Sequence, residues 1–274
     1  MDQTVTKDDC CTASETRDDN YDLIVVGAGS AGVSASITAA DAGKRVALIG
    51  HGTTGGTCVN VGCVPSKAMI RAAEAVHGGA SAARFPGVEP CDHAVDWGAV
   101  VQGTTDLVEE MRHKKYIDLL PAYKSVTYIE DGPARLVEGG VAVGGRVISA
   151  PRVLIATGSR PHLPAIEGID TVEPLDSTDL LTLPDRPESI LVLGGGYIGC
   201  ELAQMASRLG VKVTLVTRSR LLPGAEPEVA QALTQALKAE DIAVETGLAY
   251  VSVAKAAGGV NLIVERGGKT EDLT

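Results

Sequence analysis

One glycine pattern, Gly-x-Gly-x-x-Gly, occurs twice in this chain and constrains its fold more than any other feature. The glycines concerned are Gly27, Gly29 and Gly32 in the first copy and Gly194, Gly196 and Gly199 in the second. Each copy follows an apolar run typical of a buried parallel strand and precedes a stretch that we expect to be helical. Glycines at these positions allow a tight turn, close approach of the backbone to a pyrophosphate, and close packing of helix on strand. One copy is a weak signal, but two copies in this setting predict two dinucleotide-binding βαβ units.

The order of the expected elements gives the fold class. Strands are expected at 21–26, 45–49, 126–129, 135–137, 146–148, 152–156, 189–193, 211–216, 242–245 and 260–265, and helices at about 30–42, 57–78, 97–120, 197–209 and 227–240. The strand at 152–156 reads as buried. Five prolines fall between residues 161 and 187, where we place a domain boundary. The chain is therefore predicted to be α/β, with two Rossmann-like nucleotide-binding domains (the FAD/NAD(P)-binding fold), the second of them incomplete.

The segment 55–67 places two cysteines, Cys58 and Cys63, five positions apart, shortly after the first βαβ unit. Positions i and i+5 of an ideal helix lie roughly 140° apart around its axis. A disulfide needs Cα atoms within about 7 Å. Bridging the two therefore requires a distorted helical turn, which Gly62 and Pro65 would permit. A strained, accessible disulfide is readily reduced, so we predict a redox-active pair. Two buried free thiols are the alternative.

Composition narrows the function classes. The net charge of −11 argues against a nucleic-acid partner, which requires a basic face. No apolar run reaches the roughly 18 residues of a membrane span, so no membrane partner is expected. Residues 1–20 are polar and acidic, lack the apolar core of a signal peptide, and read as a disordered tail that contains Cys10 and Cys11. We expect a cytoplasmic protein, and structural disulfides are rare in that compartment. The cysteine pair is then better explained by catalysis.

The residues that follow each βαβ unit bear on cofactor choice. An acid at the end of the second strand of such a unit holds the ribose hydroxyls of NAD, but the second copy has Arg218 and Arg220 there instead. Arg218 could pair with the 2′-phosphate of NADPH, although both arginines could equally be solvated surface residues. In the first copy the acid position is Gly50, followed by His51. Ribose recognition there must use backbone, His51 or water, and His51 could equally be a plain loop residue.

With these motifs the sequence resembles the flavin-dependent pyridine nucleotide–disulfide oxidoreductases from about residue 21 to the end. Within that family, segments 51–53, 55–74 and 197–204 are most similar to the mercuric reductases. The resemblance implies a FAD-binding domain over residues 21–187 and a partial NADPH-binding domain over 188–274. Alternatives are a disulfide reductase similar to glutathione reductase or dihydrolipoyl dehydrogenase, the latter opposed by the missing NAD-type acid. A non-catalytic flavin- or metal-binding fragment is the alternative from another class.

The resemblance also implies roles for particular residues. Those expected to line FAD are Gly27, Gly29, Gly32, Gly52, Thr57, Lys67, Ala134, Thr157 and Gly158, and those expected to bind NADPH are Gly194, Gly196, Gly199 and Arg218. Lys67 would lie near the flavin and Glu201, although it could be a solvated lysine. Tyr197 would cover the flavin face where nicotinamide stacks, or could be a packing residue. Cys63 would be the thiolate next to the flavin and Cys58 the outer, exchanging thiol.

The reaction implied by the resemblance is the reduction of Hg(II) to Hg(0). Electrons would pass from NADPH through FAD, and Hg(II), the substrate, would bind the sulfurs of Cys58 and Cys63. A soft metal prefers such soft ligands. Members of the family are homodimers with a further C-terminal domain that forms the dimer, and no such domain is visible in this sequence. We therefore expect a C-terminally truncated member that could be inactive alone.

Overall fold

The first glycine turn lies in a four-stranded parallel sheet with the order β3-β2-β1-β7. The computed structural model describes residues 20–274. The strands are β1 (Leu23–Val26), β2 (Val46–Ile49), β3 (Val126–Ile129) and β7 (Val153–Ile155), and helix α1 (Ser30–Asp41) connects β1 to β2. All four residues of β2 are buried, as expected for a central strand covered on both faces.

Two different layers cover this sheet. On one face, Val25 and Leu48 pack with Val33 of α1. On the other face, Ile24 and Ile49 pack against a small antiparallel sheet. That sheet has the order β4-β5-β6 and consists of β4 (Arg135–Val137), β5 (Gly140–Val143) and β6 (Arg146–Ile148). We call residues 20–160 the first unit.

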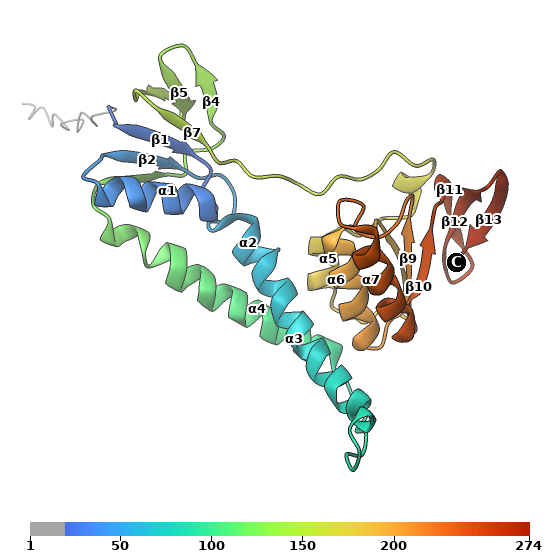
Figure 1. Ribbon diagram of the computed structural model, residues 1–274. Helices are drawn as coiled ribbons and strands as arrows, with labels where there is room; N and C mark the ends of the chain where they lie inside the picture. The colour runs from blue at the N-terminus through green and yellow to red at the C-terminus, as the bar shows by residue number, and fades with distance from the viewer. Residues whose placement is uncertain (1–19) are drawn as a thin grey trace, which may run out of the picture.

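The second glycine turn lies in a three-stranded parallel sheet with the order β10-β9-β8. Its elements are β8 (Ser189–Leu193), α6 (Tyr197–Arg208), β9 (Lys212–Thr217), α7 (Pro227–Ala239) and β10 (Ala243–Thr246). A three-stranded antiparallel sheet follows, formed by β11 (Ala249–Ala256), β12 (Gly259–Arg266) and β13 (Lys269–Leu273). We call residues 177–274 the second unit. Figure 1 shows the two units joined by a long extended segment.

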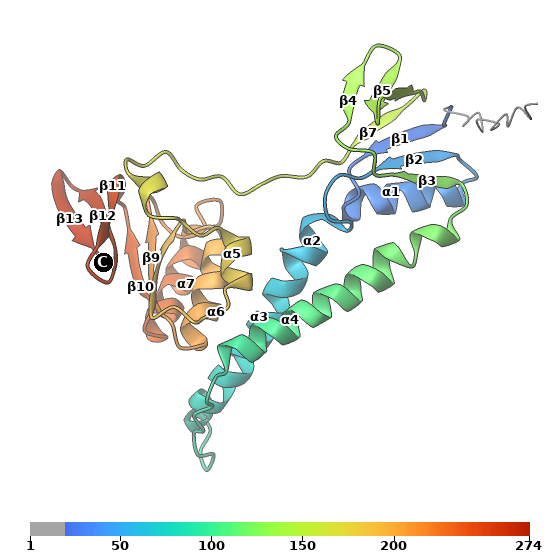
Figure 2. The ribbon, with the colours of Figure 1, turned by 180° about the vertical axis from the view of Figure 1, so that it is seen from behind.

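A pair of helices from the first unit packs against the second unit. These are α3 (Cys63–Ala80), preceded by the short helix α2 (Gly56–Asn60), and α4 (Trp97–Arg112), which continues in a π-helical turn (His113–Ile117). Figures 1 and 2 both show α3 and α4 extending side by side away from the first sheet. Met69 of α3 and Trp97 of α4 are buried in one apolar cluster with Leu202 and Met205 of α6. The second unit thus builds its core partly from these helices.

Most expected strands and helices are present, with a few differences. The structure adds β5, β11, β13 and a short helix, α5 (Ser177–Thr182), inside the proline-rich connector. The helix expected over 97–120 leaves α-helical geometry after Arg112. The prediction that the strand at 152–156 is buried is wrong, because β7 is an edge strand and all three of its residues are exposed. Within residues 20–274, no helix combines the length and apolarity needed to cross a bilayer.

Candidate functional site

Both glycine turns have the same internal geometry. A Cβ atom added to Gly32 would lie 1.8 Å from the carbonyl oxygen of Gly27, and one added to Gly199 would lie 2.0 Å from that of Gly194. The third glycine of each pattern is therefore required for the helix to begin directly against its turn. Gly29 and Gly196 are the N-caps of α1 and α6, and no side chain caps either helix. The N–H groups at both helix N-termini remain available to a pyrophosphate, so both turns fit a dinucleotide.

The cysteines lie on either side of a break between two helices. Helix α2 ends at Asn60 and α3 begins at Cys63, so the expected helix over 57–78 is interrupted at the distorted turn that the spacing predicts. A Cβ atom on Gly62 would lie 2.9 Å from the carbonyl oxygen of Thr57 and 3.4 Å from Cα of Cys58. This close approach folds the chain back and brings the side chain of Cys63 near enough to Cys58 to influence its pKa. Both cysteines are free thiols, Cys58 half-buried and Cys63 exposed.

This cysteine turn is attached directly to the first glycine turn. Gly55 donates its N–H to the carbonyl oxygen of Ala28 at 3.0 Å, and Gly29 and Gly55 form a parallel bridge. A Cβ atom on Gly56 would lie 2.6 Å from Cα of Gly29. Sequence reasoning did not assign a role to Gly55 and Gly56, although a Gly-Gly pair just before the cysteines was a usable signal for close backbone approach. The thiols are thereby placed beside the turn expected to hold a pyrophosphate.

A side-chain amide fixes the loop between the two motifs. Asn60 donates to the carbonyl oxygens of Thr54 and Gly56 at 3.0 and 2.9 Å and accepts from Arg112 of α4 at 3.2 Å. Asn60 lies in the same short helix as Cys58, so the loop and the thiol are held as one piece. The sequence analysis missed this residue because the asparagine stands in no recognised spacing.

The contact between the thiols controls the charge state of Cys58. The hydrogen bond from the Cys63 side chain raises the pKa of Cys58, and partial burial raises it further. The backbone of Cys63 and the charge of Lys115, in the π-helical turn after α4, oppose this shift. Cys58 is therefore held mainly as a thiol while Cys63 stays beside it. A bound cation would displace that proton.

Lys67 and Glu201 connect the cysteine helix to the second unit. Lys67 Nζ lies 2.5 Å from Glu201 Oε2, which joins α3 to α6 at the surface. The pair borders a small cavity of about 100 Å³ that Ile70 and Met205 also line. Tyr197 is the first residue of α6 and its side chain is 70% exposed. Lys67 thus lies beside Glu201, and the exposed side chain of Tyr197 is accessible to a ligand.

The other residues expected to line FAD all lie in the first unit. Thr157 and Gly158 follow β7 beside the first turn, where Gly27 faces the backbone of Ala156. Gly52 and Thr57 are exposed on either side of Gly55, and Ala134 packs against the apolar cluster under the β4–β6 sheet.

The two arginines after β9 differ in their surroundings. Arg220 donates to the carbonyl oxygens of Pro223 and Ala225 at 3.1 and 2.6 Å, which occupies its guanidinium in the loop. Arg218 is exposed, and within residues 20–274 it makes no hydrogen bond or ion pair. Of the two, Arg218 is the one available to a phosphate.

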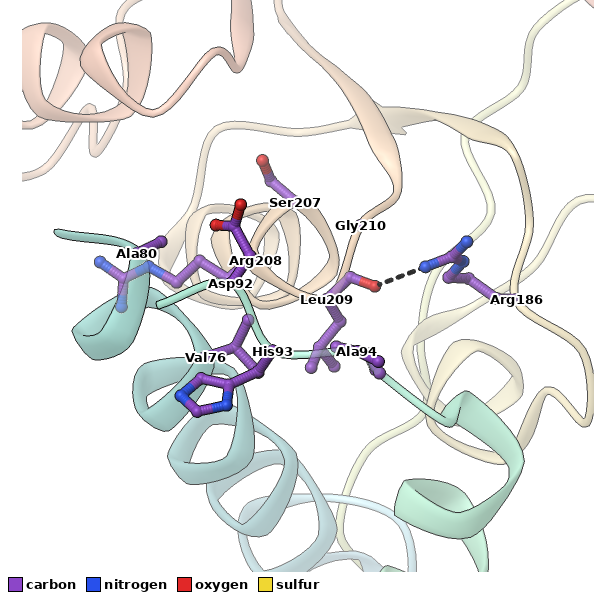
Figure 3. Close-up of a pocket in the computed structure, with 11 residues that line it drawn as sticks. Val76, Ala80, Asp92, His93, Ala94, Arg186, Ser207, Arg208, Leu209 and Gly210 are labelled. Carbon is purple, nitrogen blue, oxygen red and sulfur yellow. Dashed lines mark hydrogen bonds between the residues drawn. The ribbon is translucent and has the colours of Figure 1, made fainter. Parts of the chain in front are cut away.

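A larger cavity of about 360 Å³ lies away from all predicted site residues. Figure 3 shows it between the end of α3, residues 92–94 and the turn after α6, with Arg186 donating to the carbonyl oxygen of Leu209 at 3.3 Å. His93 and Arg208 also line it.

No group of three or more metal-ligating side chains occurs in the described part of the chain. A metal at the cysteine turn would thus have the two sulfurs as its ligands.

Comparisons with known proteins agree with this arrangement. The chain is 44% identical to the mercuric reductase of Streptomyces lividans over 82% of this chain and 48% of that protein. It is 42% identical to the mercuric reductase of Bacillus cereus over 91% of this chain and 40% of that protein. It is 38% identical to the mercuric reductase of Staphylococcus aureus over 93% of this chain and 46% of that protein. The chain thus spans less than half the length of these relatives.

Solved structures show the same fold. The Cu(II) complex of the HOCl-induced flavoprotein disulfide reductase RclA from Escherichia coli has a TM-score of 0.75 and 27% identity, covering 91% of this chain and 54% of that one. The family model described as pyridine nucleotide-disulphide oxidoreductase matches residues 21–273, which is nearly all of the described chain. With its two glycine turns and its adjacent cysteine pair, this chain belongs to the pyridine nucleotide-disulphide oxidoreductase family.

Proposed function

We propose that this chain is the nucleotide- and thiol-bearing part of a mercury(II) reductase, which reduces Hg(II) to Hg(0) with NADPH and FAD. The observation that supports this most is the pair of free thiols on either side of one sharp turn that is attached to the first glycine turn. Curated relatives named mercuric reductase share 36–44% identity with the chain. We further propose a cytoplasmic enzyme that works as a homodimer.

The first turn is the proposed FAD site and the second the proposed NADPH site. The N–H groups of α1 and α6 would each bind a pyrophosphate, and Arg218 would bind the 2′-phosphate of NADPH. FAD, when bound, supplies the means to pass electrons from a two-electron hydride donor to sulfur or a metal. Thr157 and Gly158 follow the strand next to Gly27 and would line the same site. Lys67, paired with Glu201, would supply a fixed charge near the ring.

The two thiols are the proposed substrate site. Hg(II) is a soft cation, and thiolates are the softest ligands that proteins offer. Binding requires Cys58 and Cys63 to lose their protons, and the nearby charge of Lys115 favours that loss at Cys58. Cys63, exposed where α3 begins, is the proposed thiolate beside the flavin, and the half-buried Cys58 is the proposed exchanging thiol. Tyr197, exposed at the start of α6, would cover the flavin face and move aside when the nicotinamide binds there.

The test uses two purified proteins with FAD, this chain and a form extended at its C-terminus to the full length of its relatives. We expect a flavin spectrum that NADPH bleaches, and NADPH oxidation that depends on Hg(II) in the presence of excess thiol. Cys63→Ser should retain FAD and lose Hg(II)-dependent oxidation, and Cys58→Ala should do the same. The matched control is Cys91→Ser. Cys91 is also exposed but lies outside the cysteine turn, so this variant should keep full activity.

Three results would contradict the proposal. A chain that binds FAD but oxidises NADPH equally fast without Hg(II) is not a mercury reductase. A Cys63→Ser variant with full Hg(II) turnover would show that the cysteine turn is not the substrate site. Faster turnover with an organic disulfide than with Hg(II) would assign the same thiols to a disulfide substrate instead.

A further inference from the structure

The first nucleotide site lacks an acid at the end of β2, where ribose is ordinarily recognised. Gly50 occupies that position and donates its N–H to the carbonyl oxygen of Ile129 at 2.9 Å. Glu130 directly follows Ile129, the last residue of β3, so its carboxylate lies at the carboxyl end of the neighbouring strand. Adjacent strands lie only about 4.8 Å apart, which is within the reach of a glutamate side chain. A carboxylate is therefore present one strand away from the expected position.

Two hydroxyl groups hold this carboxylate over the end of β2. Tyr128 donates from its hydroxyl to Glu130 Oε1 at 2.9 Å. Thr54, in the loop that follows β2, has its hydroxyl oxygen 2.9 Å from the Tyr128 oxygen and 3.4 Å from Glu130 Oε1. The loop itself is fixed through Asn60, as described above. All these bonds use Oε1, and in the described chain no hydrogen bond or ion pair reaches Oε2.

Gly50 and Tyr128 are sterically linked. A Cβ atom on Gly50 would lie 2.4 Å from the Tyr128 hydroxyl oxygen and 2.7 Å from its Cε2. The tyrosine ring thus occupies the space into which a side chain from the end of β2 would extend. Because the ring fills this space, an acid at position 50 and the tyrosine exclude each other. Partial burial raises the pKa of the Tyr128 hydroxyl, which agrees with a neutral hydroxyl that donates to the carboxylate.

We propose that Glu130 recognises the ribose hydroxyls of the adenosine half of FAD, in place of the missing acid of β2. Tyr128 and Thr54 are positioning residues that orient Oε1 and leave Oε2 to accept from the ribose. The assignment rests on the proposed function in that the first glycine turn must bind FAD. The assignment goes beyond the proposed function because it names Glu130 as the residue that favours binding of a ribose with both hydroxyl groups over a ribose that lacks them.

The test measures the affinity of the full chain for two ligands by quenching of flavin fluorescence. These are FAD and a FAD analogue whose adenosine ribose is 2′,3′-dideoxy. Because a hydrogen bond to a charged group is worth roughly 1.5–3 kcal/mol, Glu130→Gln should weaken FAD binding about tenfold or more. It should leave the affinity for the analogue unchanged. Tyr128→Phe should weaken FAD binding less, since it removes only the orientation of the carboxylate.

The matched control is Glu138→Gln, another exposed carboxylate on the β4–β5 turn of the same unit, which should bind both ligands normally. Unchanged FAD affinity in Glu130→Gln, or an equal loss for FAD and the analogue, would overturn the role of Glu130 and leave the proposed function standing. If the unsubstituted chain binds neither ligand, the FAD site itself is wrong and the inference fails with it.

Discussion

A thiol that donates its proton in a hydrogen bond to a second sulfur loses that proton less readily than a solitary thiol. At Cys58 this contact is the largest influence, and it raises the pKa above that of an ordinary cysteine. Removing the partner in Cys63→Ala should therefore lower the pKa. The thiolate is the reactive form, so at pH 8 Cys58 should react faster with iodoacetamide in the variant than in the unsubstituted chain.

Mass spectrometry of each alkylated cysteine across a pH series makes this measurement. Cys91, which is exposed and outside the turn, serves as the internal reference for reagent reactivity. If the pH at which Cys58 reaches half its maximal rate stays the same or rises in Cys63→Ala, the sulfurs are not in contact in solution.

Arg218 provides a second prediction for a single residue. Its guanidinium is exposed and without a bond in the described chain, whereas that of Arg220 is used by the loop. Arg218→Ala should weaken NADPH binding about tenfold or more, because a charge-assisted contact to the 2′-phosphate is lost. NADH lacks that phosphate and should bind unchanged. Fluorescence titration with both nucleotides distinguishes the outcomes. Lys212→Ala, at the opposite end of β9, is the control. Equal losses for both nucleotides would remove Arg218 from the phosphate site.

At the scale of elements, the break between α2 and α3 is what brings the sulfurs together. A methyl group on Gly62 would press against the Thr57 carbonyl and the Cys58 backbone, so Gly62→Ala should open the turn. Overpacking of this kind costs about 1–3 kcal/mol. A bifunctional thiol reagent such as dibromobimane should then cross-link Cys58 and Cys63 much less efficiently.

The control for this substitution lies in the same helix. Gly78 is within α3, and a Cβ atom there would meet nothing within 4 Å. Gly78→Ala should preserve cross-linking and should stabilise the helix by about 0.5–1 kcal/mol. Cross-linking that is unaffected by Gly62→Ala would mean that the turn has room for a side chain and that another feature sets its shape.

The elements differ in how well the sequence predicted them. Strands β3, β4, β6 and β8 were predicted with their observed bounds, because short apolar runs between turn residues leave few alternatives. Helix α5 was missed because a proline-rich stretch reads as connector, although Asp176 and Asp179 form a capping box there. The burial of β7 was predicted wrongly because an apolar run does not show whether its strand is central or at an edge.

The candidate site could be predicted from residue spacing only where its residues lie close together in the sequence. The two glycine turns and the broken helix at the cysteines follow from spacing alone, and the structure contains both. The Lys67–Glu201 pair came from resemblance, since residues so far apart have no local signal. Glu130 was missed because its position depends on the register between β2 and β3 and on Tyr128 filling the space over Gly50.

At the scale of the whole molecule, α3 and α4 tie the two nucleotide units together through a shared core. Met69 and Ala73 of α3 are almost fully buried among side chains of α6, and Trp97 donates its indole N–H to the carbonyl oxygen of Leu183 at 2.8 Å. Since α3 starts at Cys63, this packing fixes the cysteine turn relative to the second glycine turn. A packed link of this kind suits the proposed electron transfer between the two nucleotide sites.

The exposed edge of the first sheet is an apolar surface of the described chain. In β7, Val153 and Leu154 are each 38% exposed and Ile155 is 61% exposed, and β7 is the last strand of its sheet. An unpaired apolar edge strand is a template for association with another chain. We therefore expect the chain to associate with itself as concentration rises and to bind the dye ANS.

Ile155→Lys should reduce both effects, because a charged side chain on an edge strand opposes strand pairing. It should change stability by no more than about 0.5 kcal/mol, since the replaced side chain is largely exposed. Sedimentation velocity over a concentration series measures the association. Val229→Lys, which charges an isolated exposed residue on α7, is the control and should leave association unchanged. If Ile155→Lys and Val229→Lys both associate like the unsubstituted chain, contacts elsewhere in the molecule hold the copies together, and β7 is protected by its own shortness and twist.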